Sequence, residues 1–187
     1  MNHHHRSSAP WLTRAAWLGA FLLATLLFSV GLTCAVPLVA FAAICALRQS
    51  RSQALLFVTV LWLATELIGF SLLHYPTGRA AFGWAALLGV ALLAATAAAG
   101  ELARRVPRAA GVVGALAAAF GVYEGVLWAV SRMVGAAQGA FTVGILTEVF
   151  VLNAVTFAAL LLVGALTART AGRAVSLDAA QAPRRAA

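Results

Sequence analysis

The chain contains apolar stretches long enough to cross a lipid bilayer, and this pattern constrains its fold more than any other feature. Five such stretches are visible, at residues 15–47, 54–73, 80–99, 110–130 and 143–167. A spanning helix needs about 20 apolar residues, so each of the last four stretches supplies one span. With 63% hydrophobic and 10% charged residues, too few polar side chains remain to cover a globule in water. The sequence therefore predicts an all-α integral membrane protein that folds as one compact bundle.

The first stretch is too long for a single upright span. As a helix, residues 15–47 would measure roughly 50 Å, against a hydrocarbon core of about 30 Å. It forms either one tilted, kinked helix or two short helices, with a plausible turn at Gly31, Thr33 and Pro37. A third account is a signal peptide cleaved near Cys34, which would leave residues 36–47 too short to span.

The distribution of arginine favours two helices in this first stretch. All 13 basic residues are arginines. With six spans and both termini in the cytoplasm, the outer loops hold only Arg79 and Arg132. The cytoplasmic segments then hold the rest: Arg6, Arg14, Arg48, Arg51, Arg104, Arg105, Arg108, Arg169, Arg173, Arg184 and Arg185. Five spans with the amino terminus outside would move Arg6 and Arg14 to the outer side and obey the positive-inside rule less well.

We therefore predict six transmembrane helices, with the first hairpin reaching only partway into the outer leaflet. The predicted spans are residues 11–30, 34–50, 54–73, 80–99, 110–130 and 143–167. A disordered tail (residues 1–10) precedes them, and a cytoplasmic tail without a fold of its own (residues 168–187) follows. The expected location is a bacterial inner (plasma) membrane. The arginines flank apolar spans, so the charge of +8 does not indicate a nucleic-acid partner.

Three carboxyls interrupt the predicted spans, and they are the strongest candidates for a functional site. Glu66, Glu124 and Glu148 each carry an insertion cost of about 2.5–3.5 kcal/mol. In the six-span topology all three lie roughly 8–10 Å below the outer face. The functional interpretation is one polar pocket open to the outer side. The alternative is three unrelated, protonated carboxyls that are hydrogen-bonded to neighbouring groups.

The residues beside these carboxyls indicate what such a pocket would bind. Aromatic rings next to acids suit a cationic or polar organic ligand through cation–π contact and apolar packing. The candidate ligand-binding neighbours are Trp62, Phe70, Tyr123, Trp128 and Asn153. For each tryptophan alone, including Trp84, ordinary packing is the simpler interpretation.

A divalent-metal site is a weaker hypothesis for the same layer. In this hypothesis His74, in the turn "HYPTG", and Cys34 join the glutamates as ligands, and such a mixed set would suit zinc or cobalt. No pair of these residues has diagnostic spacing, and an interfacial histidine and a small buried cysteine are the ordinary alternatives. No bound cofactor is expected. The motifs of zinc hydrolases, serine hydrolases and P-loop ATPases are missing from the sequence, so we do not expect an enzyme.

The sequence favours a small transporter, or the substrate-capture subunit of a multi-chain uptake system. In size and span number the chain resembles the substrate-capture subunits of vitamin and metal uptake systems. That resemblance implies ATPase and coupling subunits as partners, beside the lipid bilayer and a small-molecule or ion ligand. The alternative is a non-transporting accessory or assembly subunit, for which the GxxxG pattern Gly121–Gly125 would supply a contact face.

Overall fold

The described part of the protein is built only from helices. The computed structural model describes residues 36–136 and 138–181, and these contain five α-helices, one 3₁₀ helix and no strand. In chain order they are α2 (Leu38–Arg48), α3 (Arg51–Ser71), α4 (Arg79–Arg105), α5 (Arg108–Val134), η1 (Gln138–Phe141) and α6 (Val143–Gln181). Four of them, α3 to α6, are long and apolar enough to cross a membrane, which agrees with the prediction of a multi-pass membrane protein. The predicted tail at residues 1–10, the span at 11–30 and Cys34 lie outside the described residues.

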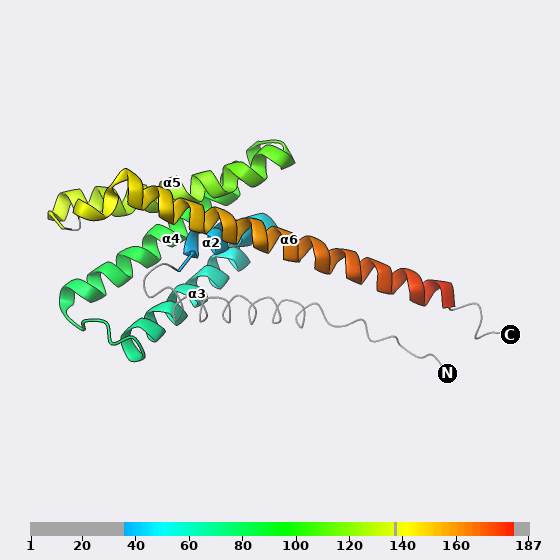
Figure 1. The fold of residues 1–187 in the computed structure, drawn as a ribbon, viewed down its shortest axis with the longest axis horizontal. Helices are drawn as coiled ribbons and strands as arrows, with labels where there is room; N and C mark the ends of the chain where they lie inside the picture. Colours follow the sequence, from blue (N-terminus) through cyan, green and yellow to red (C-terminus); the bar gives the residue numbers. More distant parts are fainter. Residues whose placement is uncertain (1–35, 137, 182–187) are drawn as a thin grey trace.

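Short connections fold α3 to α6 back and forth (Figure 1), so the bundle has two distinct ends. Helix α5 ends at Val134 and is capped by Gly135, which has a positive φ of 68° and donates its backbone N–H to the Ser131 carbonyl. We call the end that carries Arg48, Arg51, Arg104, Arg105 and Arg108 the arginine-rich end. The opposite, arginine-poor end consists of the connections at residues 72–78 and 135–142.

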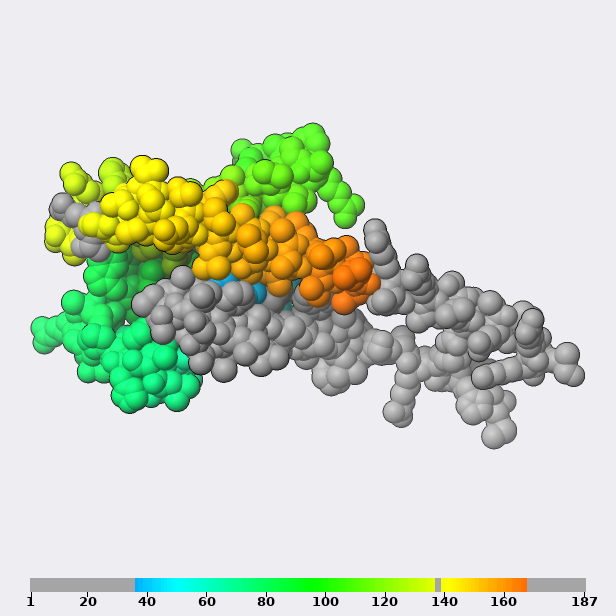
Figure 2. Space-filling model, in the orientation of Figure 1, coloured from blue at the N-terminus to red at the C-terminus, as the bar shows by residue number. Residues whose placement is uncertain are grey.

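Helix α2 lies at the centre of the bundle. Every residue from Leu38 to Cys45 is buried, and Phe41 is 0% exposed. In Figure 2 only a small part of α2 is visible, beneath α6. Its 11 residues measure about 16 Å, which is too short to cross a bilayer.

The observed start of α2 corrects the predicted span at residues 34–50. The helix begins at Leu38, because Pro37 occupies its N-cap and Val36 is not helical. Pro37 and Leu38 are buried, so the amino-terminal end of α2 lies inside the protein.

Small residues allow α4 and α5 to form the most extensive helix pair of the described bundle. Their facing sides carry Ala95 and Ala99 on α4, and Ala115 and Ala119 on α5, all 0% exposed. A Cβ atom added at Gly111 would lie 3.4 Å from the Ala103 carbonyl oxygen, so the two backbones approach closely here. By contrast, Gly121 and Gly125 are exposed with open space above them, so their GxxxG pattern does not mediate packing within the described bundle.

Helix α6 lies across the outside of the bundle and extends past its arginine-rich end (Figure 1). It is 39 residues long and continues to Gln181. Residues 168–181 of the predicted tail therefore have a helical backbone that continues from the apolar part of α6. Since α6 contacts mainly α2, most of its membrane-spanning part remains exposed.

Candidate functional site

A cavity of about 320 Å³ lies toward the arginine-poor end of the bundle, between α2, α3, α4 and α5. It includes three of the predicted ligand-binding residues, Glu66, Phe70 and Tyr123. The start of α2, the turn after α3 and one face of α4 complete its walls. These added lining residues are Val36, Leu38, Thr65, Leu73, Tyr75, Pro76, Ala81, Trp84, Ala85 and Leu88.

Glu66 is the carboxyl that lines this cavity, and it is half-buried. The Tyr123 ring is buried on the facing side of α5, and its hydroxyl lies within electrostatic range of both Glu66 and Glu124. Glu124 is half-buried but does not line the cavity. The structure thus brings two of the three predicted carboxyls to the neighbourhood of Tyr123, with Glu66 alone facing the open space.

Counted from the helix ends at the arginine-poor end, two of the three carboxyls lie at the same position along their helices, and the third lies deeper. Glu66 lies five residues before the end of α3, and Glu148 five residues after the start of α6, or about 8 Å along each helix. Glu124 lies ten residues before the end of α5, or about 15 Å, because that helix continues to Val134 instead of ending at Val130.

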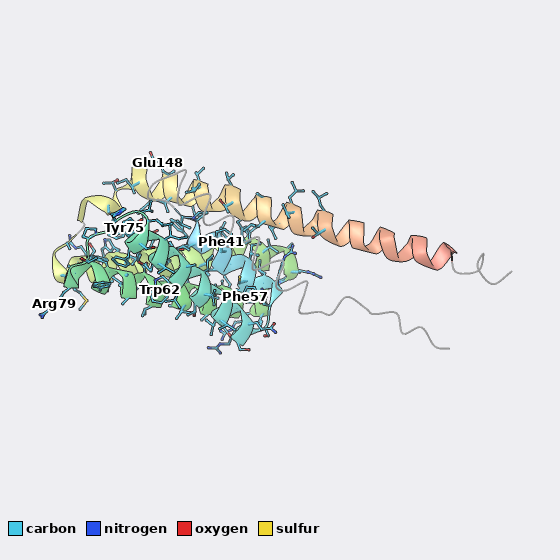
Figure 3. The ribbon with its side chains drawn as sticks, turned by 90° about the horizontal axis from the view of Figure 1, so that it is seen from below. Phe41, Phe57, Trp62, Tyr75, Arg79 and Glu148 are labelled. Carbon is cyan, nitrogen blue, oxygen red and sulfur yellow. The ribbon has the colours of Figure 1, made fainter. Side chains whose placement is uncertain are left out.

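Two predicted site residues face outward from the described bundle. Glu148 is exposed, and Figure 3 shows it on the outer side of α6, pointing away from the other helices. Trp128 is 53% exposed on α5. Neither residue lines the cavity, so the hypothesis of one pocket with three carboxyls is not realised within the described residues.

Two other predicted site residues hold helices together. The Trp62 indole N–H donates to the Ala85 carbonyl at 3.0 Å, and its ring packs where Gly89 has no side chain. Asn153 is 2% exposed; its Oδ1 accepts a hydrogen bond from the Ala40 N–H at 3.0 Å, and its Nδ2 donates to the Val149 carbonyl at 2.9 Å. Ala40 is in the first turn of α2, so Asn153 acts as a capping residue supplied by another helix.

The structure does not assemble the predicted metal ligands. His74 is exposed in the turn after α3, with a positive φ of 54°, and does not line the cavity. Among the described residues no three His, Cys, Asp or Glu side chains come close enough to hold a metal ion. Cys34, the other proposed ligand, lies outside those residues.

Sequence reasoning did not identify Tyr75 as a wall of the cavity and treated Trp84 as ordinary packing. Tyr75 folds back over α3: its N–H donates to the Gly69 carbonyl at 3.1 Å, and its ring packs against Gly69 and Phe70. No local sequence pattern predicts that the turn after α3 folds back onto that helix. Trp84 could have been identified by counting along the helix. It lies five residues after the start of α4, just as Glu66 lies five residues before the end of α3.

The cavity has the chemistry of a site for a small organic ligand. Phe70 stacks on Phe82 with ring centroids 4.9 Å apart, so the aromatic wall is itself held in place. The wall combines aromatic side chains with Thr65 and one acidic residue, Glu66. Comparisons of the chain with protein-family models, with curated proteins and with solved structures find no match in any of the three.

Proposed function

We propose that this chain is a small membrane transporter, or the substrate-capture subunit of a multi-chain uptake system, that binds a small organic cation beside Glu66. The observation that carries this proposal is the cavity itself, where a single carboxyl faces about 320 Å³ of space between aromatic walls. A carboxylate attracts a cation and the rings hold its apolar part. Without a cluster of metal ligands among the described residues, an organic cation suits the site better than a metal ion.

The position of α2 supports a transport role. Transporter sites commonly lie near the bilayer midplane, where an interrupted helix begins or ends inside the bundle. Val36 and Leu38, at the buried start of α2, both line the cavity.

We place the arginine-rich end in the cytoplasm of a bacterial cell, in accordance with the positive-inside rule. The cavity then belongs to the outer half of the bundle, and its ligand arrives from outside. We further propose six spans, with residues 11–30 forming the first one and both termini cytoplasmic. Energy for uptake comes from partner ATPase subunits or from protons.

Glu148 favours a second function, an accessory subunit of a larger membrane complex. Ionisable side chains within spans almost always face protein or water. Glu148, however, is exposed on a face of α6 that also exposes Ile145, Val151 and Val155. A neighbouring chain that pairs with this carboxyl would explain its position.

One experiment compares the two functions through two matched substitutions, Glu66→Gln and Glu148→Gln. The purified proteins are heated in neutral detergent with choline, ethanolamine or putrescine, and with 3,3-dimethylbutanol as an uncharged analogue of choline. For capture of a cation, at least one amine raises the melting temperature of the wild type and of Glu148→Gln, whereas the uncharged analogue does not. Loss of the Glu66 charge weakens that binding by about tenfold or more, the equivalent of about 1.4 kcal/mol.

The same variants test the accessory role by co-purification from membranes. A fixed set of partner chains that is retained by Glu66→Gln and lost from Glu148→Gln supports an accessory subunit. If no amine stabilises the wild type, or if Glu66→Gln binds as well as the wild type does, the capture proposal is wrong.

A further inference from the structure

A second, larger cavity lies at the arginine-rich end of the bundle, far along the helices from Glu66. It has a volume of about 990 Å³ and is bordered by the α2–α3 turn, the end of α4, the start of α5 and one side of α6. Four arginines line it: Arg48, Arg51, Arg104 and Arg108. The positive-inside rule explains arginines in these connections, but it does not require that they surround one hollow.

The charge of this cavity is not balanced by acids. None of the described residues that line it is acidic. Glu101, on the last turns of α4, forms ion pairs with Arg104 and Arg105. Arg51 and Arg108 are exposed and form no ion pair with any other described residue. A net positive charge therefore remains on the wall.

The backbone adds donors at the same place. Arg51 and Arg108 are the first residues of α3 and α5, whose N-caps, Ser50 and Pro107, make no capping hydrogen bond through a side chain. The first N–H groups of a helix are free of intrahelical partners and carry a partial positive charge, so they favour anions. Two helix starts and their arginines thus converge on one hollow.

Glycines keep this hollow open. Gly100, Gly111 and Gly164 form part of its wall and contribute no side chain. A Cβ atom at Gly164 would meet the Arg48 guanidinium, so the Arg48 side chain reaches across to α6 at this point. The cavity is therefore bordered by α6, which is largely exposed between Val143 and Thr167.

We propose that this cavity binds the phosphate group of an anionic compound. Guanidinium groups match phosphate oxygens through paired, charge-assisted hydrogen bonds, and helix starts bind the same anion. The source of the phosphate is either the headgroup of an anionic phospholipid or a soluble phosphate. Basic pockets between helices at the cytoplasmic surface suit anionic lipid headgroups. The site is independent of Glu66 and of the function proposed for it.

The test uses the full chain in neutral detergent with three probes: phosphatidylglycerol, zwitterionic phosphatidylcholine and inorganic phosphate at matched ionic strength. Native mass spectrometry measures retained lipid, and thermal unfolding measures stabilisation. The double variant R51Q/R108Q is compared with R79Q/R132Q, which removes the same charge at the arginine-poor end. We expect the wild type to prefer phosphatidylglycerol over phosphatidylcholine, R51Q/R108Q to bind it at least tenfold more weakly, and R79Q/R132Q to bind it as the wild type does.

The three probes also distinguish a lipid headgroup from a soluble phosphate as the ligand. Phosphatidylglycerol binding without an effect of inorganic phosphate identifies a lipid site, and stabilisation by inorganic phosphate identifies a site for a soluble phosphate. The proposal is overturned if neither probe binds, or if both double variants lose binding equally. If size-exclusion chromatography shows that R51Q/R108Q has not folded, the proposal is tested with the wild type alone. A preference of the wild type for phosphatidylglycerol that falls as the salt concentration rises supports the site. A preference below twofold overturns the proposal.

Discussion

Helices α2 and α6 are both apolar, yet they occupy opposite environments. In α2 every residue from Leu38 to Cys45 is buried by protein. In α6 large apolar side chains such as Val155 and Leu162 are 64% and 61% exposed, on the surface that would face lipid. One hydrogen bond between buried groups, from the Ala40 N–H to Asn153, links the two helices.

This contrast shows that apolar composition does not distinguish a protein interior from a lipid-facing surface. In a bilayer the lipid tails are as apolar as leucine, so close packing and internal hydrogen bonds decide which helix is central. Helix α2 is rich in small residues (Ala40, Ala42, Ala43), which allow several helices to approach it closely. Helix α6 carries branched side chains on most of its surface and approaches the bundle along one side.

The largest expected effect comes from emptying the space that Phe41 fills on α2. Phe41→Ala should lower the free energy of unfolding by about 2 kcal/mol, because a rigid interior leaves a cavity costing about 24 cal/mol per Å³. Leu162→Ala on α6 should change it by less than about 0.5 kcal/mol, since lipid fills the space. Unfolding by dodecyl sulfate in mixed micelles measures both. Equal losses at the two positions would contradict the contrast between these helices.

A somewhat smaller effect is expected from removing the bond that joins the two helices. Asn153→Leu should lower the free energy of unfolding by about 1–2 kcal/mol, because the amino-terminal end of α2 loses a buried acceptor. The matched control on the same helix is Thr147→Val: Thr147 is exposed, and its hydroxyl bonds only within α6, to the Val143 carbonyl. The same unfolding assay applies, and a Thr147→Val loss as large as that of Asn153→Leu would show that α6 does not depend on this link.

The smallest effects come from the same substitution at two glycines. In Gly89→Ala the new Cβ would lie 2.7 Å from the Trp62 ring, which its hydrogen bond to Ala85 holds in place, so we expect a loss of about 1 kcal/mol. In Gly164→Ala on α6 the obstacle is the flexible end of Arg48, which can move aside, so we expect a change within about 0.5 kcal/mol. Thermal unfolding in detergent measures both, and a greater loss at Gly164 would mean that α6 is the more tightly packed helix.

The candidate site was predictable only in part. Glu66 was predicted from the cost of a buried acid, Phe70 from its helical spacing to Glu66, and Tyr123 from its place next to Glu124; all three line the cavity. Glu148, Trp128 and Asn153 carried equally suggestive local patterns but do not line it. Depth along a helix can be counted from the sequence, whereas the direction of a side chain around the helix depends on which neighbours the helix meets.

The sequence by itself indicated a helical protein with four long apolar segments able to cross a membrane, and it determined which connections carry the arginines. Those properties follow from the length of the apolar segments and from the positions of the charges along the chain. Only the tertiary structure decided that α2 starts inside the bundle, that Asn153 caps it and that four arginines surround one cavity. These features depend on contacts between residues far apart in the chain, and hydropathy, which is summed along the chain, contains no information about them.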